Sequence, residues 1–416
     1  MNDSTTHNTE KKHIVVIGGG AAGYFGAIRA AEINPEACVT LLEATRKPLT
    51  KVRVSGGGRC NVTHHCFDPA LLVQRYPRGG KELRGAFARF QPKNTVEWFE
   101  SRGVELKVEG DGRMFPTTDD SKTISDCLEA EVKARGIVVR LGHMVRTVVR
   151  TDNGFELCVK IASEEAVIKA DAVLLTTGGM PGGFQLASTL GHTIISPVPS
   201  LFTFVVQDPR LDGLSGISFP EVKAELRCAG ETLKQTGPLL ITHWGVSGPA
   251  ILKLSAFGAR LLHGADYQAE LCVDFLPHHT AADLEAGLRS EKEAHPKQCP
   301  ANHPLFKVTR RFWAQIMPSI GIGPDLPWSD VTRLQMIGLI KTLKEGVFSI
   351  SGKGEFKEEF VTAGGVSLKE VDFRTMQSKV CEGLYFAGEI LDVDGITGGY
   401  NFQNAWTTSW IAGSNI

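Results

Sequence analysis

Three glycines and one acidic residue near the start of the chain have a spacing that suits phosphate and sugar binding. Gly18, Gly20 and Gly23 fit the pattern G-x-G-x-x-G, and Glu43 follows twenty residues after Gly23. The first glycine allows a tight turn, and Gly20 lets the backbone approach a pyrophosphate. Gly23 lets a helix pack closely on a strand, and Glu43 is placed to accept hydrogen bonds from ribose hydroxyls. This acid favours a free 2′-hydroxyl, so FAD or NAD is predicted rather than NADP.

The elements that must hold these residues are also visible. Residues 13–17 form an apolar, β-branched run that is typical of a buried parallel strand. Residues 21–33 read as a helix that Pro35 stops, and residues 38–42 read as the second strand. The helix would present free N–H groups and its positive dipole end to an anion.

A second glycine cluster follows at 56–58, between Arg53 and Arg59. It predicts a loop of free amides with guanidinium donors beside it, which suits a phosphate or the polar edge of a flavin. A solvated surface loop is the alternative. Residues 178–183 resemble a further dinucleotide loop, but Pro181 interrupts it, so no second Rossmann unit is expected.

The C-terminal part supplies a third group of such residues. Residues 382–389 read as a strand that ends in Gly388 and Glu389, and a helix is expected to begin at 398–401. An acid at a strand end can hold a sugar-alcohol hydroxyl. A fresh helix N-terminus can stabilise negative charge on the pyrimidine edge of a reduced flavin. Both ends of the chain are therefore expected to build one site.

These segments resemble a flavoprotein of the two-dinucleotide-binding-domain class. The sequence is similar to the bacterial family of NAD(P)/FAD-dependent oxidoreductases that includes aminoacetone oxidase and bile-acid-reducing flavoproteins. The matching segments are 15–23, 55–63, 174–179, 241–252 and 383–405. The resemblance implies FAD, with the first glycines and Glu43 on its ADP half. It also implies that Val145 lies near the adenine and Glu389 near the ribitol.

Together with the residues that the resemblance places around the flavin ring, this defines a candidate cofactor site. Its members are Gly18, Gly20, Ala22, Gly23, Glu43, Gly57, Gly58, Arg59, Cys60, Asn61, Val145, Thr177, Gly178, Gly388, Glu389, Gly399, Tyr400 and Asn401. The catalytic candidates are His243, as an acid/base, and Tyr400, as a proton donor. The alternative for His243 is a packing role in a tight turn. The alternative for Tyr400 is a role as an aromatic lid on the flavin ring. Cys60 has no partner cysteine two residues away, which disfavours a disulfide reductase.

The fold class expected is α/β. A Rossmann-like FAD-binding domain is predicted for residues 1–196 and 356–416. An inserted substrate domain, mainly β with added helices, is predicted for residues 197–355, since Pro197 and Pro199 mark a change in composition.

Composition narrows the function further. The chain has 416 residues and a formal net charge of −1, which gives no global field for nucleic acid, so no nucleic-acid partner is expected. No apolar run is long enough to span a bilayer, and the polar residues 1–12 do not resemble a signal peptide, so no membrane is expected. Nine scattered cysteines predict reduced thiols in the cytoplasm, and the His and Cys spacing predicts no metal site.

The function expected is an FAD-dependent oxidoreductase that reduces a small organic substrate through flavin N5, with NAD(P)H as a transient donor. An amine oxidase that uses O₂, as in aminoacetone oxidase, is the nearest alternative. A flavin-dependent tRNA-modifying enzyme and a non-catalytic flavin carrier are more distant ones. Substrate identity and oligomeric state stay open.

Overall fold

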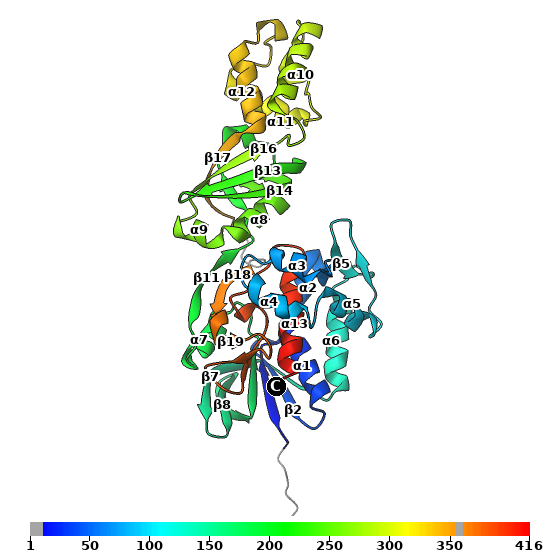
Figure 1. Ribbon diagram of the computed structural model, residues 1–416, viewed down its shortest axis with the longest axis vertical. Coiled ribbons are helices and arrows are strands. Elements are labelled where there is room, and N and C mark those ends of the chain that lie inside the picture. Colours follow the sequence, from blue (N-terminus) through cyan, green and yellow to red (C-terminus); the bar gives the residue numbers. More distant parts are fainter. Residues whose placement is uncertain (1–10, 355–360) are drawn as a thin grey trace, which may run out of the picture. The chain divides into compact units, whose positions relative to one another are not determined.

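The computed structural model describes residues 11–354 and 361–416 (Figure 1). Two compact units result, Met1–Pro197 with Val361–Ile416, and Val198–Phe360. The expected boundaries, 196/197 and 355/356, lie close to these, although the second falls outside the described residues. The segment 1–12 is expected not to be a signal peptide, and its residues 1–10 also lie outside the described residues.

The first unit is built on a seven-stranded sheet of order β19-β20-β21-β10-β1-β2-β6. Its five strands from β21 to β6 run parallel, because each pairs with its neighbour in the same direction. The strands are β1 (His13–Ile17), β2 (Cys38–Glu43), β6 (Val138–Leu141), β10 (Ala172–Leu175), β19 (Val371–Asp372), β20 (Gln377–Ser378) and β21 (Leu384–Phe386). Leu384 pairs with Val173, so the two ends of the chain share one sheet. The mixed α/β fold with a Rossmann-like sheet is thereby confirmed.

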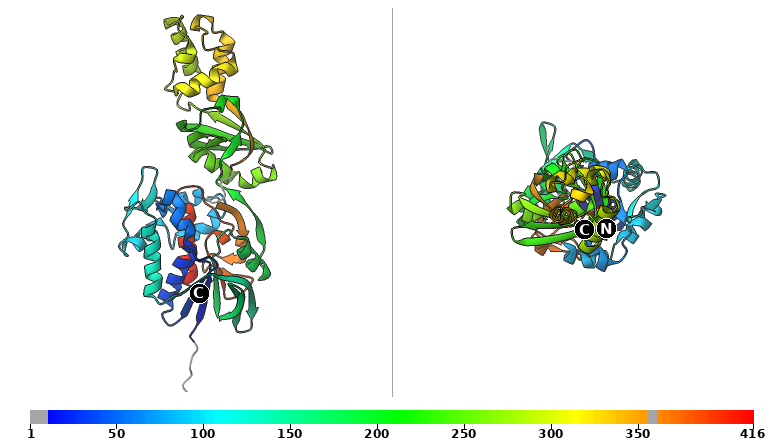
Figure 2. Two further views of the ribbon diagram at one scale, coloured as in Figure 1. Left: turned by 180° about the vertical axis from the view of Figure 1, so that it is seen from behind. Right: turned by 90° about the horizontal axis from the view of Figure 1, so that it is seen from above.

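Two helices from opposite ends of the chain lie side by side on this sheet, α1 (Ala21–Ile33) and α13 (Tyr400–Gly413), as Figures 1 and 2 both show. Their close approach depends on glycine. A β-carbon on Gly413 would lie 2.7 Å from the carbonyl oxygen of Gly26.

The remaining elements of the first unit surround this core. An antiparallel meander joins β7 (His143–Thr151), β8 (Gly154–Ile161) and β9 (Glu164–Ala170), and a smaller sheet joins β3 (Thr63–His64), β5 (Arg113–Pro116) and β4 (Leu106–Val108). Strand β11 (Ile194–Ser200) pairs with β18 (Val361–Val366). The helices are α2 (Thr50–Gly58), α3 (Pro69–Leu72), η1 (Val73–Arg75), α4 (Gly80–Phe87), α5 (Pro92–Glu100), α6 (Lys122–Ala134), α7 (Pro181–Thr189), η6 (Leu368–Glu370) and η7 (Gly388–Ile390).

The second unit is a closed six-stranded barrel with added helices. Its strands, in order around the barrel, are β12 (Phe204–Val206), β15 (Gly245–Ser247), β14 (Glu231–Thr242), β13 (Ser218–Cys228), β16 (Ala269–Asp274) and β17 (Gly346–Lys353). The longer helices are α8 (Pro249–Phe257), α9 (Ala259–Gly264), α10 (Ala281–Ala294), α11 (Arg310–Ile316) and α12 (Arg333–Lys344). Trp313 and Trp328 are fully buried in its core. A mainly β unit with helices is what the sequence predicts.

Local differences from expectation have physical causes. The segment expected as a glycine loop begins as helix α2, and its helical backbone breaks only at Ser55, Gly56 and Gly57. Pro181 starts α7 rather than interrupting a loop, because the first helical position needs no N–H donor. Strand β11 ends at Ser200 and β12 begins only at Phe204, and Leu201 between them adopts a left-handed backbone with φ 59°.

Two chain-wide features bear on function. All nine cysteines are free thiols. None of the helices in the described parts of the chain is long and apolar enough to cross a membrane.

Candidate functional site

The turn after β1 and the end of β2 are locked together by hydrogen bonds. Gly18 has φ 111°, and its N–H donates to the carbonyl of Leu42 at 2.8 Å. Glu43 Oε2 accepts from the N–H of Gly19 at 2.6 Å, and Oε1 accepts from Thr45 at 2.8 Å. Each carboxylate oxygen can accept a second hydrogen bond. Glu43 therefore holds the turn and still has acceptor capacity for ribose hydroxyls.

The start of α1 is open. Gly20 is its N-cap and offers no side-chain cap, and a β-carbon on Gly20 would meet nothing within 4 Å. The first helical N–H groups are therefore available to an anion. Gly57 and Gly58, with φ 70° and 84°, have the same free space beside them. Both glycine segments thus present bare backbone to open volume, which is what a pyrophosphate requires.

The carboxyl ends of the parallel strands bring the other glycine turns to the same edge of the sheet. A β-carbon on Gly388 would lie 2.9 Å from Cβ of Ala22. Thr176, at the end of β10, donates from Oγ1 to the carbonyl of Gly18 at 3.0 Å. The structure therefore brings together the turns after β1, β10 and β21, as the sequence predicts.

Glu389 lies in this convergence. Its Oε2 is 2.5 Å from Nζ of Lys51, and its Oε1 accepts from the N–H of Thr362 at 3.0 Å. A β-carbon on Gly178 would lie 3.8 Å from Oε2, so the turn after β10 borders this carboxylate. The sequence does not predict a role for Lys51 or Thr362. Lys51 lies more than three hundred positions from Glu389, and Thr362 lies in a separate strand, so no local pattern links either of them to that carboxylate.

One further polar group at this edge lacks a partner. Oγ1 of Thr177 is buried and makes no hydrogen bond within the described structure. A buried hydroxyl without a hydrogen-bond partner costs free energy, and a bound group that donates to it or accepts from it would remove that cost.

The N-terminus of α13 is braced by its neighbours. When both amide groups of Asn61 are satisfied, its Oδ1 accepts from the N–H of Gly399 at 2.9 Å and its Nδ2 donates to Thr63 at 3.0 Å. Asn401 binds the backbone of Gly395 through both its amide atoms, at 2.8 and 2.9 Å. The side chains of both asparagines therefore shape the loop before α13, and their contact with a flavin stays a prediction.

Tyr400 begins α13 in an aromatic setting. Its ring stacks on His64 with centroids 4.8 Å apart, and the hydroxyl of Tyr76 donates to its backbone carbonyl at 2.7 Å. Burial raises the pKa of the Tyr400 phenol above its usual value, so the hydroxyl keeps its proton. His64 donates from Nε2 to the carbonyl of Asp111 at 3.1 Å, and burial lowers the pKa of its imidazole. His64 follows directly after the segment 55–63, but no spacing pattern in the sequence predicts a role for it.

Arg59 is not a free hydrogen-bond donor, and Cys60 is not placed as a reactive thiol. The guanidinium of Arg59 binds Glu109 at 2.6 Å and lies 4.0 Å from the ring centre of Phe115. Cys60 is fully buried with φ 62°, and burial raises the pKa of its thiol to about 12. Any contact of these two residues with a flavin would therefore come mainly from their backbone.

Val145 lies half-buried in β7, paired with Val159. The meander is tied to the turn after β2 because the N–H of Gly142 donates to the carbonyl of Thr45 at 3.0 Å. His243, by contrast, is an exposed residue of the second unit, in the turn between β14 and β15. Its role beside a flavin stays a prediction.

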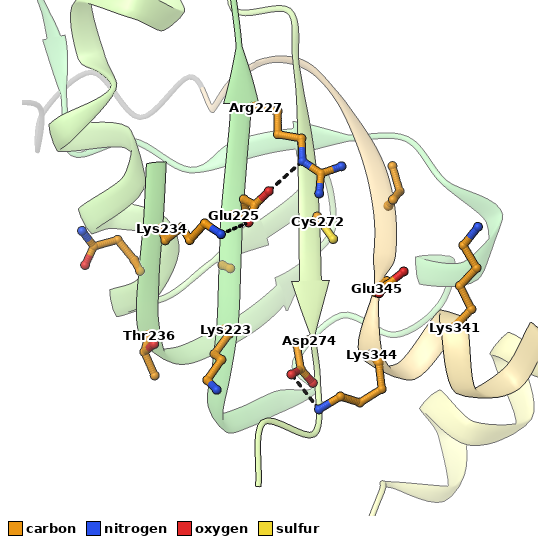
Figure 3. A pocket seen from close by; sticks show the side chains of 13 residues that line it. Lys223, Glu225, Arg227, Lys234, Thr236, Cys272, Asp274, Lys341, Lys344 and Glu345 are labelled. Atoms are coloured by element: carbon orange, nitrogen blue, oxygen red, sulfur yellow. Dashed lines mark hydrogen bonds and ion pairs between the residues drawn. The ribbon is translucent and has the colours of Figure 1, made fainter. Parts of the chain in front are cut away.

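The second unit has a hollow of about 660 Å³ on the outer face of its barrel, between β13, β14, β16 and the end of α12 (Figure 3). Basic side chains outnumber acidic ones in its lining, and some of them form ion pairs. Glu225 pairs with Arg227 and Lys234, and Asp274 pairs with Lys344 at 2.7 Å. None of the candidate cofactor residues lines this hollow.

The parallel sheet, the open glycine turns and the two carboxylates define a Rossmann-like flavoprotein oxidoreductase. The model of the HI0933-like protein Rossmann domain matches residues 12–415. The chain therefore belongs to the HI0933-like family, a family of FAD-dependent oxidoreductases. The unpartnered Thr177 hydroxyl, the open amides and the spare acceptor capacity of Glu43 fit FAD at this edge.

The chain is similar along nearly its whole length to two kinds of characterised protein. One is a 3-dehydro-bile acid delta(4,6)-reductase of Clostridium scindens, 30% identical over 96% of this chain and 98% of the relative. The other is a ribosomal RNA dihydrouridine synthase of Escherichia coli, 28% identical over 98% of each chain. The structure also resembles a 3-ketosteroid-delta4-(5alpha)-dehydrogenase from Rhodococcus jostii, with 15% identity over 99% of each chain and a TM-score of 0.49.

Proposed function

We propose that this protein reduces a carbon–carbon double bond conjugated with a carbonyl group, with NAD(P)H as the electron donor. The observation that supports this most strongly is the agreement between its two kinds of relative. A 3-oxo bile acid with 4,6 double bonds and the uracil ring of uridine both contain an alkene conjugated with a carbonyl. Addition of one hydride and one proton saturates one such double bond, so the uracil ring requires one addition and the 4,6-diene requires two.

FAD, when bound at this edge of the sheet, would supply hydride-transfer chemistry through N5, with NAD(P)H as the source of the electrons. The chain's own residues bind the cofactor, orient the substrate and provide the proton. We assign proton donation to the hydroxyl of Tyr400, because His64 and Tyr76 fix its ring and backbone at the N-terminus of α13. His243 is the second candidate donor.

The sheet supports a transient rather than a permanent site for NAD(P)H. Within the described residues, β10 is followed by α7 and then by β11, which pairs with β18 outside the seven-stranded sheet. A second βαβ unit for a nicotinamide nucleotide is therefore not part of the proposal.

The test is an anaerobic two-step reaction with purified holoenzyme. NADH or NADPH should bleach the flavin absorbance, and a conjugated 3-oxo-4-ene steroid acid or uridine 5′-monophosphate should restore it. The variant Tyr400→Phe should lower the rate of the second step by about 100-fold or more and leave FAD content unchanged. Flavin that NAD(P)H does not bleach, but that a primary amine bleaches with later release of peroxide, would replace this proposal with the amine oxidase alternative.

Reduction of uracil within RNA is a second candidate. It is favoured by the Escherichia coli relative and by a similar ribosomal RNA dihydrouridine synthase of Haemophilus influenzae, 29% identical over 97% of this chain. The formal net charge of −1 weighs against it, since RNA binding normally needs a basic face. Mass spectrometry of unmodified ribosomal RNA incubated with holoenzyme and NADPH tests it, because dihydrouridine adds two hydrogens per modified base.

A further inference from the structure

One arginine near Tyr400 has no role in holding the fold. Arg75 ends η1 and is exposed, and its guanidinium makes no ion pair, hydrogen bond or ring contact within the described structure. The arginines of this unit that pack against other elements behave differently, since Arg78 pairs with Asp394 and Arg59 pairs with Glu109. The exposed guanidinium of Arg75 is therefore available to bind a ligand.

The backbone of Arg75 is held firmly against the loop that leads into α13. Its carbonyl accepts from the N–H of Ile396 at 2.9 Å. The next residue, Tyr76, binds the backbone of Tyr400, and Arg78 forms a β-bridge with Asp394. A tight contact adds to this, since a β-carbon on Gly79 would lie 2.5 Å from Val393. The segment 75–79 therefore runs along residues 393–400, and the base of the Arg75 side chain is fixed there.

The charge of Arg75 reaches the groups around the proposed proton donor. It lowers the pKa of Tyr400, of His64 and of Cys66, in each case as a smaller effect than burial. His64 is itself neutral because burial lowers the pKa of its imidazole. The charge of Arg75 therefore acts on these groups, whereas Arg84 on α4 is also exposed and is not among the charges that shift their pKa values.

From this geometry we infer that Arg75 is a specificity-determining residue that binds an oxyanion of the substrate, while Tyr400 faces the reacting double bond. The inference rests on the proposed function and deepens it. A guanidinium binds carboxylate and phosphate oxygens through paired N–H donors, and both relatives act on molecules that carry such oxygens, a bile acid and an RNA. The shared chemistry is an oxyanion at a fixed distance from a conjugated carbonyl.

The test compares substrates that differ only in charge. One pair is 3-oxo-4-cholenic acid and its methyl ester, and the other is uridine 5′-monophosphate and uridine. With the wild-type holoenzyme, the anionic member of one pair should have the lower KM. Arg75→Gln should raise KM for that anion by about tenfold or more, change KM for the neutral partner by less than about twofold, and leave kcat nearly unchanged. Whichever pair responds identifies the source of the oxyanion.

Controls separate this role from a structural one. Arg75→Lys should recover part of the preference, and Arg84→Gln should leave it intact. FAD content and the thermal unfolding temperature should match the wild type in all three variants. Equal KM for charged and neutral substrates in the wild type, or equal loss for both in Arg75→Gln, would refute the role of Arg75 with the proposed reaction intact. If the reduced wild-type enzyme turns over no conjugated substrate at all, the proposed function itself fails and this inference falls with it.

Discussion

The carbonyl oxygen of Gly18 lies only 1.8 Å from the position that a β-carbon on Gly23 would occupy. No side chain fits at that distance, so the turn after β1 and the first turn of α1 can pack as they do only with glycine at position 23. Substitutions at Gly20 and Gly23 can therefore distinguish a packing role from a ligand-binding role. Gly23 serves the packing of the protein, whereas the open space at Gly20 serves a ligand.

The first prediction concerns this pair. Gly23→Ala should destabilise the first unit by about 1–3 kcal/mol or more, because the backbone must move to admit the methyl group. Gly20→Ala meets no atom within 4 Å, so it should leave the unfolding of the apoprotein nearly unchanged. It should nevertheless lower FAD affinity at least about tenfold, because the methyl group would fill the approach to the pyrophosphate. Urea unfolding of the apoproteins and FAD titration measure both effects. Equal destabilisation by the two variants would contradict it.

A second prediction concerns Glu389 and its ion pair with Lys51. The side chain of Lys51 is 59% exposed, so Lys51→Ala should cost no more than about 1 kcal/mol of stability. It should leave FAD affinity unchanged or slightly stronger, because the carboxylate is freed for a ribitol hydroxyl. Glu389→Gln should weaken FAD binding by about tenfold, since an amide oxygen accepts less strongly than a carboxylate. Fluorescence quenching of added FAD gives both dissociation constants. Weaker binding in Lys51→Ala than in Glu389→Gln would show that the lysine, not the acid, holds the cofactor.

The sequence predicts the parts of this site that depend on local patterns. The turn at Gly18, the helix after it and the acid at position 43 lie within about thirty residues and have a spacing fixed by one βαβ unit. The same holds for Gly388 and Glu389, which follow directly after a buried strand. Parallel strands present their carboxyl ends at one edge, so the convergence of these turns also follows from the pattern.

The parts that could not be predicted depend on contacts between distant segments. Arg59 looks like a free donor beside three glycines, but its partner Glu109 comes from a strand connection fifty residues later. The stacking of His64 on Tyr400 joins residues from opposite ends of the chain, and no periodicity marks either as a partner of the other. The run at 50–58 reads as a loop because three glycines dominate it, although the five residues before them are sufficient for a turn of helix.

The third prediction is that Cys60 is chemically inert. Burial raises the pKa of its thiol to about 12, so the thiolate is scarce at neutral pH. Iodoacetamide should modify the exposed Cys38 and leave Cys60 unmodified in the folded holoenzyme, as peptide mass spectrometry would show. Cys60→Ser should keep NAD(P)H oxidation within about twofold of the wild type. A loss of about 100-fold with normal FAD content would instead indicate a redox role for this thiol.

The fourth prediction concerns a buried histidine that acts through stability rather than chemistry. The hydroxyl of Ser378 accepts hydrogen bonds from the N–H groups of Val380 and Cys381, at 2.9 and 2.7 Å, so it donates its own proton to Nε2 of His192 at 2.8 Å. The neutral imidazole therefore carries its proton on Nδ1, which faces Glu370 at 3.2 Å. Protonation of Nε2 would break the bond with Ser378.

Burial lowers the pKa of His192 in the folded protein below its ordinary value of 6.5. The unfolded chain therefore binds the proton more readily, and stability should be unaffected above pH 6.5 and should fall as the pH drops below it, by up to about 1.4 kcal/mol per pH unit. His192→Gln should flatten this slope at the cost of some stability at neutral pH, whereas the exposed His65→Gln should keep it. Urea unfolding of the first unit, followed by release of FAD fluorescence at several pH values, tests both variants. The same slope in His192→Gln as in the wild type would show that protonation of His192 does not cause the acid sensitivity.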